Sequence, residues 1–322
     1  MKAIVQTGYG TPDLFELREV PRPEVKENEV LVRVRATTIN AGDVFGMRGS
    51  PWMVRFSIGL PKPKDYIPGW DVAGQVEAVG SAVTRFQPGD EVYASISGTC
   101  AEFARAIEDK FAPKPASLTF EQAAAVPAAA TPPLHGLRDI AQVQPGQQVL
   151  INGASGGVGT FSVQIAKALG AEVTGVCSTR SVEIVRSIGA DHVIDYTQED
   201  FCQTNQRYDV IFDNVASRSF TDLQRIVADG GVILPNSGHA GIGYVVGAAL
   251  RSMFVRQQGR PFLAEPDHKD LAYLTELIEA GKITPVIDRT YALSDFRKAM
   301  AYMDEGHARG KVVLTVEQGD AA

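Results

Sequence analysis

The chain has 322 residues, a formal net charge of −7, and 44% hydrophobic and 21% charged residues. This length is sufficient for two domains, and the composition is that of an ordinary soluble globular protein. The acidic balance argues against a nucleic-acid-binding protein, because such proteins present a basic face.

The cysteines and the first residues bear on the cellular compartment. Cys100, Cys177 and Cys202 are scattered without metal-type spacing, which favours a reducing compartment and no disulfide framework. The start, MKAIVQTGYG, lacks the apolar segment of a signal peptide. The most apolar later run, 240–250, is too short to span a bilayer. These features predict a soluble, cytoplasmic protein without a membrane partner.

The first third of the chain is rich in predicted strands. Alternating and β-branched residues occur in KAIVQTG, EVLVRVRATTIN, DVAGQVEAVG and DEVYASI. The stretch VRFSIGLPKPKDYIP is expected to be an irregular surface loop. From about Phe120, the Ala-rich stretch EQAAAVPAAATPPLHGLRDIA predicts helices whose bends are fixed by prolines, at the entry to a second domain.

Strands and helices then alternate. The predicted strands are QVLIN, EVTGV, HVIDY, YDVIFD and GVILPNSG, with helices ending at Leu169 and around VEIVRSIG and FTDLQRIVAD. Apolar strands separated by amphipathic helices are typical of a parallel sheet covered on both faces. The last part predicts a helix, a strand, a helix and a strand in DLAYLTELIEAG, PVIDRTY, SDFRKAMAYMDEG and GKVVLTV.

The stretch INGASGGVGT lies between a predicted strand and a predicted helix. In the register of a dinucleotide-binding fingerprint, Gly156 and Gly159 take the second and third glycine positions, and Ala154 replaces the first. A helix that begins near Gly157 would direct its free N–H groups at a phosphate. We expect a dinucleotide pyrophosphate here; the alternative is a glycine-rich turn without a ligand. The predicted contacts are Ser155, Gly156, Gly157, Val158 and Gly159.

The end of the next strand, GVCSTR, indicates which dinucleotide binds. NAD-selective sites usually place Asp or Glu there to bind the ribose hydroxyls. Here Ser178 and Arg180 follow Cys177, so we expect no carboxylate to repel a 2′-phosphate, which a hydroxyl and a guanidinium can bind. Tyr196, which ends the following predicted strand HVIDY, adds a phenol donor to the same pocket. The prediction is NADP(H); the alternative makes Arg180 a solvated residue at a helix start and Tyr196 a rim aromatic.

In this order, the motifs resemble those of the medium-chain dehydrogenase/reductase superfamily, in its zinc-free quinone oxidoreductase-like branch. The similar segments span nearly the whole chain: VRATTINAGD, IPGWDVAGQVEAVGSAV, QPGDEVY, INGASGGVG, IGADHVIDY and RGKVVLTV.

The resemblance implies an α/β fold with two domains. A GroES-like, β-rich catalytic domain would comprise residues 1–122 and 265–322, and a Rossmann domain with a doubly wound parallel sheet would comprise 123–264. The active site would lie in the cleft between them. The apolar stretch 238–255 would form a dimer contact or a substrate wall, which predicts a homodimer.

The resemblance also bears on zinc. Zinc-dependent members carry Cys where this chain has Asn40, and Gly-His-Glu where it has Gly69-Trp70-Asp71; the four-cysteine lobe for structural zinc is missing. Zinc prefers thiolate, imidazole or carboxylate ligands in a tetrahedral set, which Asn and Trp do not supply. We therefore expect no metal.

Hydride transfer without a metal favours particular substrates. Quinones and α,β-unsaturated carbonyls spread the developing charge by conjugation, whereas simple alcohol oxidation needs an alkoxide to be stabilised. Asn40, Asp43 and Tyr66 are the candidates for polarising the substrate oxygen, with Asn40 favoured because the resemblance places it toward the cofactor. Asp43 as a turn-capping carboxylate and Tyr66 as a loop aromatic are equal alternatives.

Further residues are candidates for contacts with substrate or cofactor. Trp52, Met53 and Phe56 form an apolar group that either lines the substrate pocket or packs the loop down. The resemblance implies cofactor contacts for Thr131, Asn214, Val215, Ser237, Phe262, Leu263 and Lys311.

Three functions remain open. The leading hypothesis is an NADPH-dependent reductase of quinones, enones or enals. An enoyl-thioester reductase shares the chemistry but would need a basic entrance for a carrier or CoA phosphate, for which no Lys/Arg cluster is evident at the loop. An NADPH-binding sensor with little turnover is consistent with the lack of a clear proton donor. The substrate itself does not follow from the sequence, because this scaffold hosts many substrates.

Overall fold

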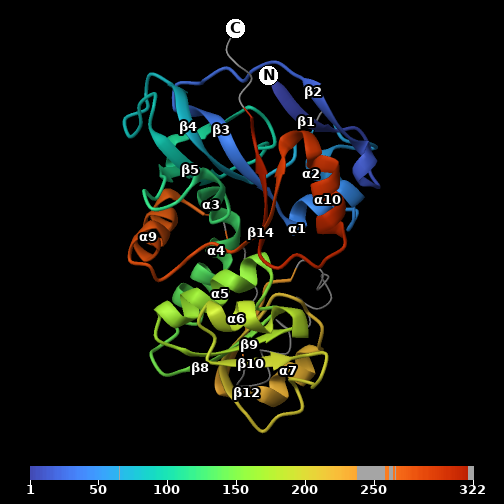
Figure 1. Cartoon of the computed structure of the whole chain (residues 1–322), viewed down its shortest axis with the longest axis vertical. Helices are drawn as coiled ribbons and strands as arrows, with labels where there is room; N and C mark the ends of the chain where they lie inside the picture. Colours follow the sequence, from blue (N-terminus) through green and yellow to red (C-terminus); the bar gives the residue numbers. More distant parts are fainter. Residues whose placement is uncertain (65, 238–257, 261–263, 265, 318–322) are drawn as a thin grey trace. The chain divides into compact units, whose positions relative to one another are not determined.

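The computed structural model describes residues 1–64, 66–237, 258–260, 264 and 266–317, and it divides into two compact units (Figure 1). Unit 1 comprises Met1–Ala128, Pro266–Glu279 and Pro285–Ala322, and unit 2 comprises Ala129–Glu265 and Ala280–Thr284. The first and last parts of the chain, blue and red in Figure 1, therefore belong to the same unit.

The boundaries of the units differ from the predicted ones for identifiable reasons. The chain passes from unit 1 to unit 2 after Ala128, whose backbone N–H donates to Asp71 of unit 1 at 2.7 Å. The segment Ala280–Thr284 belongs to unit 2 because the Gln164 amide donates to the Thr284 carbonyl at 3.0 Å and accepts from its N–H at 2.8 Å.

Unit 1 is built on an antiparallel-rich sheet. Its strands are β3 (Glu29–Ile39), β4 (Asp71–Val79), β5 (Glu91–Ser95), β6 (Phe103–Ile107), β7 (Phe111–Pro113), β14 (Ile287–Ala292) and β15 (Lys311–Thr315). Their order is β14-β15-β3-β4-β5-β7, with β6 also paired to β3. A separate ribbon pairs β1 (Lys2–Gln6) with β2 (Phe15–Glu19).

The strand register of unit 1 brings three distant segments to one end of the sheet. Strand β15 runs antiparallel to β3 with Val312 opposite Ile39, so Lys311 lies where β3 ends. Strand β4 pairs with β3 through Val72 opposite Thr37, so Asp71 lies at the same end. The pairing therefore places the start of β15, the end of β3 and the start of β4 together.

Helices and apolar side chains complete unit 1. The helices are α1 (Ala41–Arg48), α2 (Val54–Ile58), α3 (Phe120–Ala124), α9 (His268–Glu279) and α10 (Phe296–Asp304). The ring of Phe296 packs edge-to-face on Phe15 at 4.8 Å between centroids, which fixes α10 against the core. The buried hydroxyl of Tyr93 on β5 donates to the Leu271 carbonyl at 2.7 Å and thereby holds α9.

Part of the predicted irregular loop is helical. Residues Val54–Ile58 form α2, so the prediction of a wholly irregular stretch is wrong there. The N–H of Val54 donates to the Pro51 carbonyl, which opens the turn, and the helix ends at Gly59, whose φ of 142° favours glycine.

Unit 2 contains the predicted doubly wound parallel sheet, so the fold class is confirmed. Its strands are β8 (Gln148–Asn152), β9 (Glu172–Cys177), β10 (His192–Asp195), β11 (Tyr208–Asp213), β12 (Val227–Pro235) and β13 (Gln258–Gly259). Their order is β10-β9-β8-β11-β12-β13, so the order reverses between β8 and β11. In such sheets, ligands bind at the carboxyl ends of the strands at this switch point.

The helices of unit 2 are short except for the one after the glycine loop. They are α4 (Pro127–Pro133), whose first two residues still belong to unit 1, a π-helix (Leu134–Ile140), α5 (Gly157–Ala168), α6 (Val182–Ser187) and α7 (Phe220–Ile226). Because parallel crossovers are right-handed, α5 and α6 cover one face of the sheet and α7 the other. Helix α7 ends earlier than predicted, because Val227 already pairs with Tyr208 as the start of β12.

No helix among the described residues is long and apolar enough to cross a membrane.

Candidate functional site

The glycine loop of unit 2 has the geometry of a phosphate-binding turn. Gly153 has a φ of 76°, which lets the chain turn sharply out of β8. A Cβ on Gly159 would lie 2.0 Å from the Gly153 carbonyl oxygen, so only glycine allows α5 to pack on the loop. Gly156 caps the N-terminus of α5 in an extended conformation.

The N-terminus of α5 suits an anion. The first helical bond runs from the Thr160 N–H to the Gly156 carbonyl at 2.9 Å, so the N–H groups of residues 157–159 precede the helical ladder. The first turn contains no acidic residue. The helix dipole and these N–H groups favour negative charge, so the residues fit a dinucleotide pyrophosphate.

A polar network joins the carboxyl ends of three neighbouring strands. Buried Asp213, at the end of β11, accepts bonds from Asn152 Nδ2 at 2.8 Å and from the Ala216 N–H at 2.9 Å. Asn214 donates through Nδ2 to the Asn152 carbonyl at 3.2 Å and accepts from Asn236 Nδ2 at 2.9 Å. These bonds fix the loops that follow β8, β11 and β12 relative to one another.

The other predicted cofactor contacts of unit 2 lie at different depths. Val215 is exposed beside the glycine loop, because a Cβ on Gly153 would lie 2.6 Å from Val215 Cγ2. Ser237 is half-buried just after β12, and Thr131 is fully buried in α4. Phe262, Leu263 and the stretch 238–255 lie outside the described residues.

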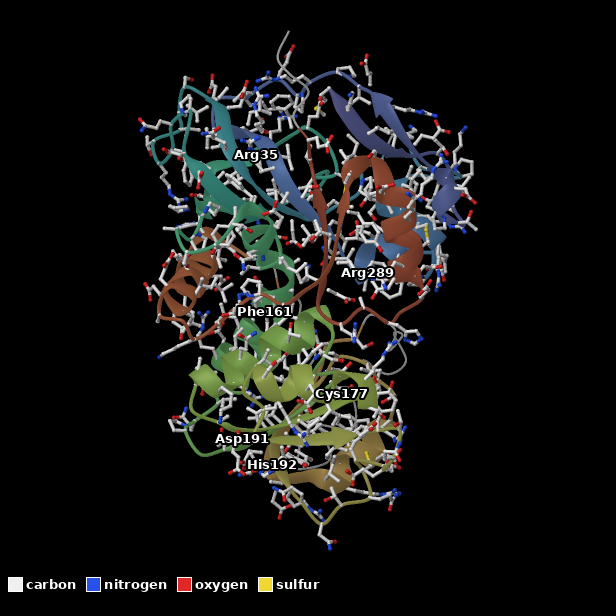
Figure 2. All side chains as sticks on the ribbon, viewed as in Figure 1. Arg35, Phe161, Cys177, Asp191, His192 and Arg289 are labelled. Atoms are coloured by element: carbon white, nitrogen blue, oxygen red, sulfur yellow. The ribbon has the colours of Figure 1, made fainter. Side chains whose placement is uncertain are left out.

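The predicted 2′-phosphate pocket contains a carboxylate that the sequence reasoning missed. Figure 2 labels Cys177, which ends β9 and pairs with Asp195 at the end of β10. Thr179 Oγ1 donates to Asp195 Oδ2 at 2.5 Å, and this bond lowers the pKa of Asp195. The expectation that no carboxylate stands here is therefore wrong. The signal was present in HVIDY, but only the pairing of β10 with β9 places its aspartate beside the threonine.

The remaining residues of this pocket are near one another. Ser178 is half-buried and Arg180 is exposed directly after β9. The Tyr196 N–H donates to the Cys177 carbonyl at 3.0 Å, and the Tyr196 side chain is exposed. The structure thus brings together the three residues that the sequence predicted for the 2′-phosphate.

A second polar cluster lies in unit 1 and centres on Asp71, which is fully buried at the start of β4. Its Oδ2 accepts bonds from Asn40 Nδ2 and Lys311 Nζ, both at 3.1 Å. Thr38 Oγ1 donates to the same oxygen at 2.5 Å. Oδ1 accepts from the Ala128 N–H, so donors surround both oxygens of the carboxylate.

Lys311 lies in this cluster together with Asn40. Its Nζ donates to Asn40 Oδ1 at 2.5 Å, and only 4% of its side chain is exposed. Sequence reasoning missed Asp71 and Thr38. Asp71 stands at the position of Glu in the Gly-His-Glu segment of zinc-dependent members. This position in the resemblance could have indicated that Asp71 belongs to the site.

Asp43 is buried between two backbone segments. Its carboxylate accepts from the Asn40 N–H at 2.8 Å and from the Gly69 N–H at 2.9 Å. It thereby caps α1 and joins it to the segment before Trp70, as the capping alternative expects. Burial raises the pKa of Asp43 to about 6, against the lowering effect of these two N–H bonds.

Tyr66 and Trp70 lie beside the same cluster. Burial raises the pKa of Tyr66 to about 12, with the Asp43 charge adding to the rise and a hydrogen bond to the Trp70 side chain opposing it. The Trp70 ring lies on the backbone of α1, since a Cβ on Gly42 would be 2.3 Å from Trp70 Cη2. The structure thus brings Asn40, Asp43 and Tyr66 into one region of unit 1.

The apolar group at the start of α2 stays open to solvent. Trp52 and Phe56 are 65% and 64% exposed, and their rings meet edge-to-face at 5.1 Å between centroids. Met53 is 43% exposed. These exposures disfavour the alternative in which the three side chains pack the loop down.

Comparison with known proteins defines the class. Residues 26–136 match the family described as Alcohol dehydrogenase GroES-like domain, and residues 188–314 match the family described as Zinc-binding dehydrogenase. The chain therefore belongs to the medium-chain dehydrogenase/reductase superfamily, with a GroES-like part and a Rossmann-like part.

The most informative relatives narrow the branch. A chloroplastic NADPH-dependent alkenal/one oxidoreductase of Arabidopsis thaliana is 33% identical, over 98% of this chain and 79% of the relative. The Chloroplast envelope quinone oxidoreductase homolog of Arabidopsis thaliana is 32% identical, over 98% of each. The structure of the quinone oxidoreductase from Coxiella burnetii matches with a TM-score of 0.88 at 28% identity, over 98% of this chain and 99% of that one. This protein is an oxidoreductase of the quinone oxidoreductase-like branch.

One family description includes zinc, but the residues in the corresponding place do not fit it. Asn40 Oδ1 and Asp71 Oδ2 both bond to the ammonium of Lys311, so the cation that they face belongs to the protein. Among the described residues, no group of three or more His, Cys, Asp or Glu side chains is arranged to hold a metal. An amide and one carboxylate are a poor donor set for zinc.

The buried carboxylate of Asp43 predicts a pH-dependent stability. Its folded pKa of about 6 lies above the ordinary value of 3.8, so the folded state holds the proton more tightly than the unfolded state. The stability contributed by this proton is complete below about pH 4 and is lost as pH rises through about 6, on the order of 3 kcal/mol in total. Urea denaturation of the wild type and Asp43→Asn across this pH range should show this loss only in the wild type.

A control variant loses one carboxylate, as Asp43→Asn does, but loses it at an exposed position. Glu183→Gln removes a carboxylate whose side chain is 90% exposed and should leave the pH dependence as in the wild type. Parallel curves for the wild type and Asp43→Asn between pH 4 and 6 would contradict the assignment.

Proposed function

We propose that this oxidoreductase transfers hydride from NADPH to quinones or to α,β-unsaturated carbonyl compounds, without zinc. The observation that carries the proposal is the glycine loop at the switch point of unit 2, where the N-terminus of α5 fits a pyrophosphate. The names of the two plant relatives, an alkenal/one oxidoreductase and a quinone oxidoreductase homolog, support the substrate class.

Residues of unit 2 would hold the cofactor, which when bound supplies a hydride. The loop residues Ser155–Gly159 bind the pyrophosphate through their N–H groups. The Asp213 network positions the loops that carry Asn214 and Val215. Arg180, with Ser178 and Tyr196 beside it, binds the 2′-phosphate and offsets the charge of Asp195.

Tyr66 is the best-placed group for orienting the substrate oxygen. The Tyr66 hydroxyl carries one proton that it can donate to a substrate oxygen. Because the pKa is raised to about 12, this hydroxyl keeps its proton at neutral pH and donates a hydrogen bond rather than acting as a strong acid. Water would then protonate the reduced substrate.

A substrate panel tests the proposed activity. NADPH oxidation is followed at about 340 nm with quinones, enals, enones and an enoyl thioester, and metal content is measured on the same sample. We expect turnover of quinones or enals by zinc-free protein. Turnover confined to the thioester would indicate an enoyl reductase, and tight NADPH binding without any turnover would indicate a sensor.

The place of action and the oligomeric state remain predictions. The scattered cysteines favour a reducing compartment such as the cytoplasm, whereas the two plant relatives are named as chloroplast proteins. The homodimer was predicted from the stretch 238–255 and is tested by the mass of the protein in solution.

Charge reversal at Arg180 tests the choice of NADPH over NADH. Arg180→Glu places a carboxylate against the 2′-phosphate, so the dissociation constant of NADPH should rise more than about 10-fold, while that of NADH changes less than about threefold. Fluorescence titration of both cofactors measures the two constants. Equal effects on both, or wild-type NADH binding as tight as that of NADPH, would reject NADPH selectivity.

The complementary change is Asp195→Asn. It removes the negative charge beside Thr179 while keeping a side chain that can accept the Thr179 bond. NADPH should then bind more tightly than to the wild type, and NADH should be little affected.

Substitutions at two glycines of the loop distinguish loss of cofactor contact from loss of protein packing. A Cβ on Gly156 would lie 3.5 Å from the Gly153 carbonyl, an ordinary contact, whereas one on Gly159 would clash at 2.0 Å. Gly156→Ala should therefore keep the melting temperature and weaken NADPH binding by about 10-fold or more, because the new methyl group meets the pyrophosphate. Gly159→Ala should lower the melting temperature as well. Unchanged NADPH affinity in Gly156→Ala would place the pyrophosphate elsewhere.

A further inference from the structure

We infer that Lys311 is a positioning residue that fixes the direction of the Asn40 carboxamide, rather than a direct cofactor contact. The inference rests on the proposed function. Lys311 Nζ lies 2.5 Å from Asn40 Oδ1 and 3.1 Å from Asp71 Oδ2, and Asn40 Nδ2 lies 3.1 Å from the same Asp71 oxygen. The three side chains thus form a closed triangle.

This triangle permits one orientation of the amide. The ammonium only donates and the carboxylate only accepts, so the Asn40 oxygen must face Lys311 and the nitrogen must face Asp71. The reversed amide would set N–H groups against the ammonium and the oxygen against the carboxylate. Without Lys311, the acceptors Asp71 and Thr38 alone would select the orientation, and the Asn40 oxygen would lose the donor that holds it.

Burial and backbone geometry hold Lys311 in place. Its N–H donates to the Val286 carbonyl at 2.8 Å, and a Cβ on Gly310 would lie 2.4 Å from that same oxygen, so glycine is needed before the lysine. The side chains of Lys311 and Asp71 are 4% and 0% exposed. A buried ion pair contributes little net stability, so a positional role is a better reason for this pair than stability alone.

The fixed orientation determines what Asn40 offers to a ligand. Its two amide protons point to Thr38 Oγ1, at 3.2 Å, and to Asp71. The oxygen has one lone pair left beyond the Lys311 bond. Asn40 therefore accepts a hydrogen bond from a ligand hydroxyl and does not donate to the substrate oxygen. This leaves Tyr66 as the donor among the three predicted catalytic residues.

A double-mutant cycle tests the inference on the hydride-transfer rate in single turnover at saturating NADPH. Asn40→Ala and Lys311→Met should each slow this step roughly 10- to 100-fold, and the double variant should be no more than about threefold slower than the slower single variant. Lys311→Arg should recover much of the rate, because a guanidinium can donate to both Asn40 and Asp71. Independent, multiplying effects would overturn the inference, as would Lys311→Met weakening NADPH binding more than 10-fold when Asn40→Ala does not.

Two further variants distinguish the effect of Lys311 on the orientation of Asn40 from a general loss of folding stability. Lys114→Met removes another buried lysine of unit 1, which bonds to the Leu118 carbonyl at 2.7 Å, and should leave the hydride-transfer rate unchanged. If Lys311→Met does not fold because Asp71 is left unpaired, Asp71→Asn/Lys311→Met removes both charges. A folded double variant with the wild-type rate would overturn the inference.

A binding measurement distinguishes failure of the inference from failure of the proposed function. A wild type that binds NADPH but reduces no substrate defeats the proposed reductase activity only. In that case the same double-mutant cycle is measured on the fluorescence emission maximum of bound NADPH instead of on the hydride-transfer rate. Asn40→Ala and Lys311→Met should shift it equally, and the double variant should add nothing; additive shifts would overturn the inference.

Discussion

The pairing of β15 and β4 with β3 is the constraint on which unit 1 depends. It brings Asn40, Asp71 and Lys311, which are far apart in sequence, to one end of a sheet. Burial makes an isolated charge costly, so the carboxylate of Asp71 requires the ammonium of Lys311 once both are enclosed. The amide between them completes the hydrogen bonding of both charges. The strand register, rather than any single sequence motif, therefore brings these three residues together.

In unit 2, the predicted phosphate-binding loop is determined mainly by local sequence. A parallel sheet brings all its carboxyl strand ends to one edge, and the loop that leaves the first strand carries the glycines that an anion requires. Asp213 then joins the loops after β8 and β11 through Asn152 and Ala216. Buried side chains hold the loops at this edge of the sheet, so the backbone N–H groups at the start of α5 are already in place for an anion.

This difference explains what the sequence could predict. The glycine loop, the alternating strands and the doubly wound sheet follow from short-range periodicity and turn chemistry, and the sheet has the predicted order of elements. The bond between Thr179 and Asp195 did not follow, because it depends on the pairing of β9 with β10. The roles of Thr38 and Asp71 were missed for the same reason: both lie in segments quoted for their resemblance, but Thr38 bonds to Asp71 across two paired strands, and Lys311, the second partner of Asp71, lies 240 residues beyond Asp71. Helix α2 was missed because its five residues lie among prolines and a glycine.

The charge balance of the unit 1 cluster restricts the chemistry that it can support. The positive charge of Lys311 is matched by Asp71, and the nearby carboxylate of Asp43 is bound to two backbone N–H groups. The cluster therefore offers a substrate oxygen hydrogen bonds, from the Tyr66 hydroxyl in our proposal, but little net positive charge. A simple ketone would concentrate the full charge of the reduced oxygen at one atom beside these carboxylates. A quinone or an enal spreads that charge over a conjugated system, so such a substrate needs least from the protein. In our proposal, the exposed aromatic rings of Trp52 and Phe56 contact the flat, apolar body of the same molecules.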